Sequence, residues 1–186
     1  MPVKKVCVIT GGTSGIGLCT AQAMLEKGYT VYELSRRAEG VPGMQHIVAD
    51  VTKEETLAAA VQEILKQEDH IDVLINNAGI SMVGLLSDMS VEEWDKIIAT
   101  NLSSVFYTSK CVIPSMVSHK SGHIIQISSV WGSVGASCEV AYSACKGGIN
   151  SFTRALGKEL APSHIQVNAI ACGCIDTSMN NCFSPE

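Results

Sequence analysis

Short apolar runs alternate along the chain with stretches of helical periodicity. The apolar runs show little polar alternation, which is typical of strands buried on both faces of a parallel sheet. They cover residues 6–10, 30–34, 46–49, 72–76, 123–128 and 165–171. Helical patterns cover residues 16–27, 53–67, 90–118, which is expected to hold one or two helices, and 142–161. This alternation predicts an α/β fold, a Rossmann-type doubly wound parallel sheet in three layers.

Local signals refine the helix ends. Thr52, with Glu55 three residues later, predicts a capping box at the start of the second helix, and Pro162 marks the end of the last one. The chain has 186 residues without an internal repeat or linker. We therefore expect a single dinucleotide-binding domain over 1–186.

Composition excludes several classes of protein. The net charge is −5 and no Lys/Arg-rich run occurs, so nucleic acid is not expected as a partner. No apolar stretch approaches the roughly 18 residues of a membrane span, and the N-terminus lacks signal-peptide features, so we expect a cytoplasmic protein with no membrane partner. The eight cysteines are interpreted as reduced thiols. Cys172 and Cys174 lack a second pair at zinc spacing, so no metal site is expected.

The residues that follow each predicted strand matter most, because ligands bind parallel sheets at the carboxyl ends of the strands. TGGTSGIG (10–17) follows the first strand. Glycine allows a tight turn and a close approach of backbone to phosphate at a helix N-terminus. The alternative is a purely structural turn.

Ser35, Arg36 and Arg37 follow the second strand. Arginine matches the 2′-phosphate of NADP, whereas an acidic residue binds the NAD ribose. Glu33, two residues before Ser35, could reach the ribose, but because it lies within the strand it is expected to point elsewhere. The residues therefore favour NADP(H) over NAD(H), and the alternative is two solvated arginines on a loop.

The third strand ends in Asp50-Val51 and the fourth in NNAG (76–79). A short carboxylate beside a small apolar residue can hold an adenine edge, and NNAG can bring backbone close to a flat ligand while its amides bind neighbouring strand ends. Either motif could instead cap a helix or turn.

YSACK (142–146) places Tyr142 and Lys146 four positions apart. On a helix these side chains share one face. The pair is either a surface coincidence or a lysine placed to make a phenol acidic.

Taken together, TGGTSGIG, NNAG, Asn101, Ser129 and the Y-x-x-x-K of YSACK resemble the short-chain dehydrogenase/reductase family, over about residues 3–180. The chain is similar to bacterial ketoacyl-carrier-protein reductases. The family's serine lies 13 positions before its tyrosine, which selects Ser129 over Ser128. The resemblance implies an NAD(P)(H)-dependent oxidoreductase that interconverts a secondary alcohol and a ketone.

The resemblance also implies roles. Tyr142 would be the acid/base, with a phenol pKa lowered by the Lys146 ammonium. Lys146 would also bind the nicotinamide ribose, and Ser129 would donate to the substrate oxygen. Asn101 would kink its helix and hold a water. The implied cofactor-binding residues are Gly11, Thr13, Ser14, Gly15, Ile16, Gly17, Ser35, Arg36, Arg37, Asp50, Val51, Asn77, Ala78, Gly79, Tyr142, Lys146, Ile175 and Thr177.

Three features depart from the family pattern. Ala171-Cys172-Gly173-Cys174 stands where the family usually has Pro-Gly, and Cys138 lies in a segment that often faces substrate. Cys138 is interpreted as a packing residue, with a reactive thiol as the alternative. The sequence also ends before the family's seventh strand and lid helices, which would leave 165–171 as an exposed edge. A non-catalytic dinucleotide-binding module, or an inactive truncated fragment, is therefore the alternative function.

The family commonly forms a homodimer through the helices that correspond to 90–118 and 142–161. We expect the same contact here because apolar residues recur at helical spacing on these segments; core packing is the alternative. The residues are Ile97, Ile98, Val105, Phe106, Ile149, Phe152 and Leu156.

Overall fold

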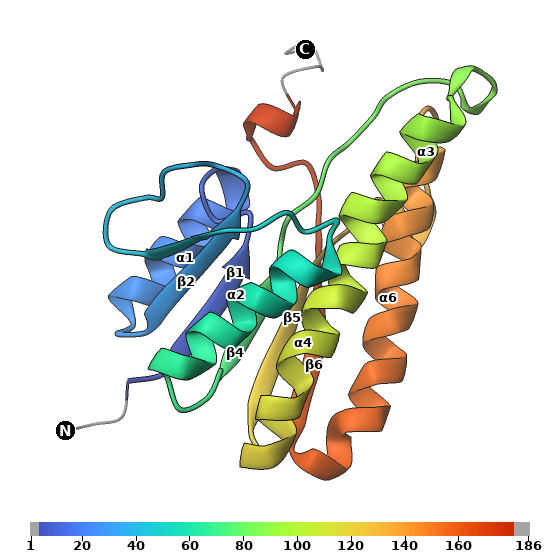
Figure 1. Cartoon of the computed structure of the whole chain (residues 1–186). Helices are drawn as coiled ribbons and strands as arrows, with labels where there is room; N and C mark the ends of the chain where they lie inside the picture. The colour runs from blue at the N-terminus through green and yellow to red at the C-terminus, as the bar shows by residue number, and fades with distance from the viewer. Residues whose placement is uncertain (1–3, 181–186) are drawn as a thin grey trace.

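A six-stranded parallel sheet forms the centre of the computed structural model, which describes residues 4–180 (Figure 1). The strand order is β3-β2-β1-β4-β5-β6. The strands are β1 (Val6–Thr10), β2 (Thr30–Ser35), β3 (Gln45–Val48), β4 (Val73–Asn76), β5 (Gly122–Ser129) and β6 (Ile165–Cys172). The predicted fold class and all six predicted strands are confirmed, with bounds that differ by at most one residue at either end.

Helices cover both faces of the sheet. They are α1 (Gly15–Glu26), α2 (Glu54–Gln67), α3 (Val91–Ile98), α4 (Ser104–His119), α5 (Trp131–Val134) and α6 (Val140–Leu160). Helices α2, α4 and α6 lie in front of the sheet in Figure 1, whereas α1 packs on the opposite face. The result is the expected three layers.

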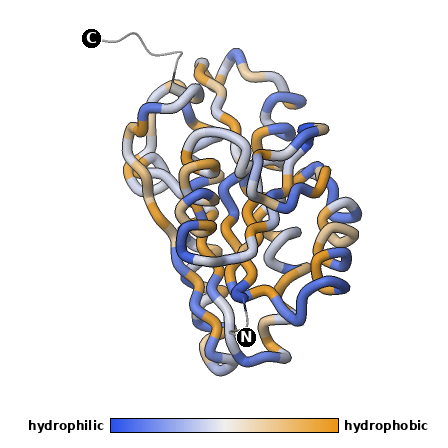
Figure 2. Tube along the Cα trace, turned by 90° about the vertical axis from the view of Figure 1, so that its left-hand side faces the viewer, coloured by the Kyte–Doolittle hydropathy of each residue, from blue (hydrophilic) through white to orange (hydrophobic). Residues whose placement is uncertain are grey.

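The apolar runs become strands because both faces of the sheet are covered. Every residue of β1 is buried. Val6 and Val8 belong to the core beneath α2, α4 and α6, while Cys7 and Ile9 belong to the core beneath α1. Figure 2 shows the hydrophobic positions gathered along the strands in the interior. A strand between two cores has no polar face, which explains the missing alternation.

The direction in which the chain adds strands to the sheet reverses between β1 and β4. From β1 the chain proceeds to β2 and β3 on one side, and from β4 to β5 and β6 on the other. The loops after β1 and β4 therefore diverge at the carboxyl ends of the strands. A doubly wound sheet opens a crevice at this switch point.

One local prediction about the helices was wrong. Helix α2 has Lys53 as its N-cap without a side-chain cap, and the Thr52 side chain is turned toward Asp50, where its hydroxyl donates to Oδ1 (2.8 Å). The segment 90–118, expected to hold one or two helices, holds two, α3 and α4, which are joined by a π-helical segment, Ala99–Ser103. A capping box does occur at the start of α3, where Ser90 and Glu93 exchange hydrogen bonds.

Strand β6 lies at one edge of the sheet, and among residues 4–180 it pairs only with β5. Most of its residues are exposed, so the interpretation of 165–171 as an edge strand is confirmed for the described part of the chain.

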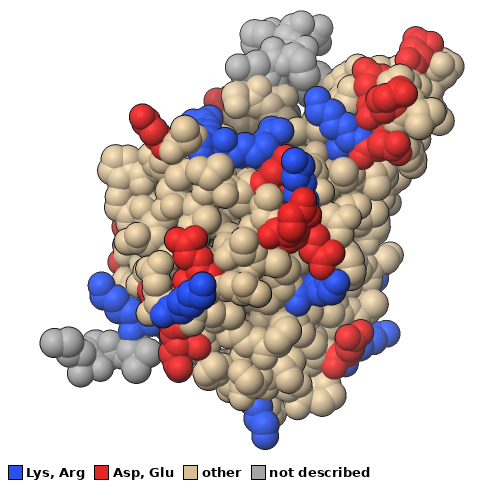
Figure 3. All heavy atoms as spheres, viewed as in Figure 1, with Lys and Arg blue, Asp and Glu red and all other residues tan. Residues whose placement is uncertain are grey.

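The surface and the helices give two further findings. In the view of Figure 3, Lys and Arg side chains are interspersed with Asp and Glu and form no continuous basic area on that face. Between residues 4 and 180, no helix combines the length and the apolar character that crossing a membrane requires.

Candidate active site

A cavity of about 650 Å³ lies at the carboxyl ends of the strands. Its walls come from the glycine-rich turn, the ends of β2, β3 and β4, the end of β5, helix α6 and the segment after β6. Apart from Gly17 and Asn101, every residue predicted for cofactor binding or catalysis lines it. The structure therefore brings together residues that are spread over most of the sequence.

The glycine-rich turn has steric reasons for two of its glycines. Gly11 has a φ of +67°, in the left-handed region that glycine favours. Gly17 does not line the cavity, but a Cβ there would overlap the carbonyl of Gly11 and the side chain of Asn77. Gly17 therefore lets the first turn of α1 pack against the end of β1, a structural role that the motif also requires.

The start of α1 offers backbone donors to the cavity. The first hydrogen bond of the helix runs from Leu18 N–H to Ser14 O, and the Ser14 side chain forms no capping hydrogen bond. Unsatisfied N–H groups at a helix N-terminus attract anions. Since Gly15 and Ile16 line the cavity, this end of it suits a phosphate or pyrophosphate group.

Asn77 connects the ends of β1 and β4. Its Nδ2 donates to the carbonyls of Thr10 and Gly11, both at 3.0 Å, and Thr10 Oγ1 accepts from the N–H groups of Asn77 and Ala78, both at 3.1 Å. These four bonds hold the floor of the cavity rigid. The expectation that NNAG amides bind neighbouring strand ends is confirmed.

The end of β2 points its arginines and its acid in different directions. Arg36 and Arg37 line the cavity. Glu33 is fully buried, and its carboxylate accepts from Gly12 N–H (3.1 Å), from the Ser35 hydroxyl (3.3 Å) and contacts His46 Nδ1 (2.6 Å). Its oxygens are thus engaged inside the protein, as expected, and Glu33 does not line the cavity.

His46 was missed by the sequence analysis. Its second ring nitrogen, Nε2, lies 2.9 Å from the carbonyl of Arg37. The imidazole therefore connects the buried carboxylate of Glu33 to the backbone of the arginine loop. No local motif announces this contact, because it depends on the pairing of β2 with β3, in which Glu33 lies opposite His46.

Asp50 at the end of β3 both lines the cavity and caps a turn. Its Oδ1 accepts from the Thr52 N–H (3.0 Å) and hydroxyl (2.8 Å). Burial acts to raise the pKa of Asp50, but these hydrogen bonds and the charges of Arg36 and Lys53 outweigh it and hold the pKa below its ordinary value. Asp50 is therefore an anion, and both uses left open by the sequence are compatible with its position.

Asn101 lies in the π-helical segment rather than on the cavity wall. Its Oδ1 accepts from Ile80 N–H (2.8 Å) and its Nδ2 donates to Ile80 O (2.7 Å). The expected irregularity of the helix at Asn101 is confirmed. The side chain joins this irregular turn to the segment that follows β4, and nearby Ile80 and Thr100, which the sequence analysis missed, do line the cavity.

The two serines at the end of β5 have different surroundings. The Ser128 hydroxyl donates to Asn150 Oδ1 (2.7 Å) and thereby connects β5 to α6. Ser129 Oγ accepts from Trp131 N–H (3.2 Å) and shares a hydrogen bond with Tyr142. The choice of Ser129 over Ser128 is consistent with this arrangement.

Tyr142 and Lys146 lie one turn apart on α6, but the expected lowering of the phenol pKa is wrong. Burial raises the pKa of Tyr142 above its ordinary value, the hydrogen bond with Ser129 counteracts this, and the charge of Glu139 adds to the rise. Lys146 Nζ lies 5.4 Å from the centroid of the Tyr142 ring and donates to Ile127 O at 2.6 Å. The ammonium faces the ring rather than stabilising a phenolate.

Burial also acts on the lysine. Only 4% of Lys146 is exposed, and burial lowers its pKa to about 8. At neutral pH the side chain is therefore mostly a cation. Its contact with Ile127 O uses one of three N–H donors, which leaves the others for a hydroxyl group in the cavity.

Glu139 and Ser81 form a polar pair beside the site that the sequence analysis missed. The Ser81 hydroxyl donates to Glu139 Oε1 at 2.5 Å, and Glu139 is 7% exposed. Glu139 precedes Tyr142 by three positions, so helical spacing was a signal that could have indicated it.

The cysteines occupy different places relative to the cavity. Cys172 lines it, as do Gly173, Ile175 and Thr177. Cys138 does not line the cavity. It lies in a turn with a φ of +62°, and its carbonyl oxygen accepts from Gly84 N–H (2.8 Å). No disulfide joins two of the cysteines between residues 4 and 180; the eighth cysteine, Cys182, lies outside the described residues.

Comparison with known families and proteins gives a consistent result. The family model described as short chain dehydrogenase matches residues 5–186. The 3-oxoacyl-acyl-carrier-protein reductase FabG of Thermotoga maritima is 39% identical over 186 residues, which cover 94% of this chain and 76% of that protein. Cyclopentanol dehydrogenase of Comamonas sp. is also 39% identical, over 94% of this chain and 74% of the relative.

Solved structures with the same arrangement include two that differ in their ligands. Actinorhodin polyketide ketoreductase with NADPH has a TM-score of 0.90 and 34% identity, over 95% of this chain and 72% of the other. The ligand-free aldohexose dehydrogenase of Thermoplasma acidophilum has a TM-score of 0.91 and 35% identity, over 95% and 69%.

Proposed function

Because the chain belongs to the short chain dehydrogenase family, we propose that it is an NADP(H)-dependent oxidoreductase that interconverts a secondary alcohol and a ketone, with Tyr142 as the acid/base. The observation that carries the proposal is the meeting of Ser129, Tyr142 and Lys146 in one cavity with the unsatisfied N–H groups of α1. A nicotinamide cofactor bound there would supply or accept the hydride.

Tyr142 and Ser129 would handle the substrate oxygen. Their hydroxyl groups share a hydrogen bond at the cavity wall, so both can approach one oxygen atom. The raised pKa keeps Tyr142 protonated at neutral pH, as a proton donor to a ketone oxygen must be. Ser129 would donate to the same oxygen as negative charge develops on it.

Lys146 and the strand ends would hold the cofactor. The N–H groups that open α1 suit the pyrophosphate, and the free donors of Lys146 suit the ribose hydroxyls. Ile175 and Thr177 line the cavity beyond Lys146 and would contact the carboxamide and phosphate. Asp50 and Val51 would hold the adenine edge.

Turnover with substrate tests the proposal against a non-catalytic dinucleotide-binding module. We expect the full chain to consume NADPH with at least one member of a panel of small ketones and acyl thioesters, measured at the NADPH absorbance. The panel follows from the names of two relatives, a 3-oxoacyl-acyl-carrier-protein reductase and a cyclopentanol dehydrogenase. Tight NADPH binding without consumption of any panel member would favour the module.

The arginine loop carries a prediction about cofactor choice. NADPH should bind at least tenfold more tightly than NADH, because a charge-assisted contact with the 2′-phosphate contributes about 1.5–3 kcal/mol. Arg36 is the better candidate for this contact, since its charge already acts on Asp50 in the cavity. Arg36→Ala should weaken NADPH and leave NADH nearly unchanged in a fluorescence titration.

Arg154→Ala is the matched control, because Arg154 is exposed on α6 and contacts Ser151 rather than the cavity. Equal dissociation constants of the two cofactors for the unaltered chain would contradict the proposed preference.

We further propose a homodimer through α4 and α6. Four of the apolar residues expected at this contact are buried in the chain's own core, namely Ile97, Val105, Ile149 and Leu156, so core packing explains them. The support for the dimer is therefore Phe106, which is 47% exposed on α4.

Size-exclusion chromatography with light scattering should show a dimer at micromolar concentration. Phe106→Glu should convert it to a monomer, because a carboxylate buried in an apolar contact is costly. Val83→Glu, at an exposed apolar residue outside these helices, should leave the dimer intact. A monomer or a tetramer of the unaltered chain contradicts the proposed contact.

A further inference from the structure

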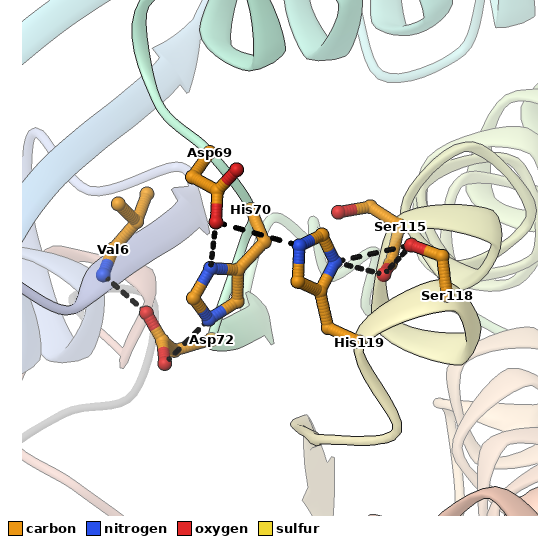
Figure 4. A network of polar contacts seen from close by, with 7 residues as sticks. All are labelled: Val6, Asp69, His70, Asp72, Ser115, Ser118 and His119. Carbon is orange, nitrogen blue, oxygen red and sulfur yellow. Dashed lines mark hydrogen bonds and ion pairs between the residues drawn. The ribbon is translucent and has the colours of Figure 1, made fainter.

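A cluster of two histidines and an aspartate lies at the amino ends of the strands, whereas the cavity lies at their carboxyl ends. Asp69 and His70 belong to the segment between α2 and β4, and His119 is the last residue of α4. Both segments lead into the amino ends of strands, β4 and β5, that are neighbours in the sheet. Figure 4 shows the side chains of Asp69, His70 and His119 turned toward one another.

The distances within the cluster are too long for direct hydrogen bonds and suit an ion. Asp69 Oδ2 lies 3.8 Å from His70 Nδ1 and 3.5 Å from His119 Nε2. The three candidate ligand atoms all lie within 4.8 Å of one another. Ligands bound to Zn²⁺ at about 2.0–2.1 Å in a tetrahedron are separated from one another by roughly 3.3–3.4 Å. Small movements would therefore bring all three atoms to one ion.

The outer hydrogen bond of His70 orients its ring. His70 Nε2 lies 3.1 Å from Asp72 Oδ1, and Asp72 Oδ2 accepts from Val6 N–H at 2.7 Å. Because a carboxylate only accepts, Nε2 carries the hydrogen, and the lone pair of the neutral ring is on Nδ1. That nitrogen is the one that faces Asp69.

The outer hydrogen bond of His119 has the same effect. His119 Nδ1 lies 2.9 Å from the carbonyl oxygen of Ser115 in the preceding turn of α4. A carbonyl only accepts, so Nδ1 carries the hydrogen and the lone pair of the neutral ring is on Nε2. Both imidazoles thus turn a basic nitrogen toward the carboxylate of Asp69, which is how ligating histidines are held in metal sites.

We propose that Asp69, His70 and His119 bind a divalent transition-metal ion of the Zn²⁺ class. Imidazole and carboxylate are ligands that suit Zn²⁺. Three protein ligands leave one position of the tetrahedron for water. A sequence search based on closely spaced cysteine or histidine pairs does not find this site, because His119 lies far along the chain from the other two residues.

The rings must rotate out of their stacked arrangement when the ion binds. They are stacked, with centroids 4.6 Å apart and planes 20° from parallel, whereas an ion lies in the plane of each imidazole that binds it. The Asp69 and His119 side chains are 83% and 35% exposed, so both can adjust. The bound ion would connect the end of α4 to the segment before β4.

Isothermal titration calorimetry with ZnCl₂, on the tag-free full chain after treatment with a chelator, tests the site. His70→Gln keeps a donor for Asp72 but removes Nδ1, and His119→Asn keeps a donor for Ser115 but removes Nε2. Each should weaken Zn²⁺ at least tenfold. His164→Asn is the matched control, because His164 is exposed with a left-handed φ of 58°, which asparagine tolerates.

Asp72→Asn tests the outer hydrogen bond without removing a ligand. The Val6 N–H requires an oxygen acceptor, so the nitrogen of the new side-chain amide would face His70 Nε2 and move the ring hydrogen to Nδ1. Zn²⁺ affinity should fall by about 10- to 100-fold. Unchanged affinity in this variant would overturn the role assigned to Asp72.

The thermal midpoint gives a second readout. Zn²⁺ should raise it in the unaltered chain and in His164→Asn, because a ligand that binds the native state stabilises it, but not in His70→Gln. Asp69→Asn, at an exposed side chain, replaces any histidine variant that fails to fold. Absence of saturable binding, or equal affinity in the unaltered chain and both histidine variants, would overturn the site; the latter result would assign the ion to cysteines.

Discussion

Replacing Tyr142 by phenylalanine is expected to lower turnover by about two to four decades, the range that a positioned general acid contributes. The ring keeps its volume and its place beside Lys146, so packing and cofactor affinity should change little. Only the transferable proton and the hydrogen bond with Ser129 are lost. Single-turnover ketone reduction, followed by the loss of NADPH absorbance, measures the effect on the chemical step.

Tyr107→Phe is the matched control, because Tyr107 lies on α4 and does not line the cavity. Its turnover should equal that of the unaltered chain. If Tyr142→Phe retained full turnover on an accepted substrate, the proposed acid would be wrong.

The raised pKa of Tyr142 adds a pH dependence to this prediction. Alcohol oxidation needs the phenolate as the proton acceptor, and burial disfavours the charged form. The oxidation rate of the unaltered chain should therefore rise with pH above neutrality, while Tyr142→Phe should lack this rise. Ketone reduction uses the protonated phenol and should not gain from the same increase in pH.

Replacing Lys146 by alanine is expected to lower both turnover and cofactor affinity, because two tasks are assigned to one side chain. The ammonium lies 5.4 Å from the centroid of the Tyr142 ring, and Lys146 lines the cavity. Turnover should fall by at least two decades, in the range of general acid–base assistance. Fluorescence titration with NADPH measures the affinity, and this second loss separates Lys146→Ala from Tyr142→Phe.

Lys158→Ala is the control for this variant, since Lys158 is an exposed lysine on the same helix. A change of thermal midpoint must also be measured, because Lys146 is buried and donates to Ile127 O. Normal NADPH affinity in a folded Lys146→Ala variant would refute its cofactor role, and normal turnover would refute its part in the proton transfer.

The proposed active site and the proposed metal site lie at opposite ends of the strands, which makes their tests independent. The cavity occupies the carboxyl ends of the strands, whereas Asp69, His70 and His119 lie at the amino ends of β4 and β5. A variant of the histidine cluster should therefore leave NADPH binding unchanged, and Tyr142→Phe should leave Zn²⁺ binding unchanged.

Features that depend on neighbours in the chain could be predicted from the sequence. The strands were recognised because burial on both faces requires continuous apolar residues. Tyr142 and Lys146 share a face because they are one helical turn apart. The glycine-rich turn was recognised because few other residues permit its backbone. Each of these features is determined by a few consecutive residues or by a fixed spacing between residues in the family's motifs.

Features that depend on competition between distant groups were decided only by the tertiary structure. The Thr52 side chain does not cap α2 and is turned toward Asp50 Oδ1, a partner that the capping pattern did not include. Burial raises the pKa of Tyr142, and this burial arises only when the layers pack around α6. The Lys146 ammonium donates to Ile127 O on β5, a residue remote in the sequence. His119 met His70 because β4 and β5 pair side by side. The sequence by itself determined which segments form strands and helices and which residues share a face. The burial and the hydrogen-bond partner of each polar group were decided when folding brought remote donors and acceptors within reach and removed water as the alternative.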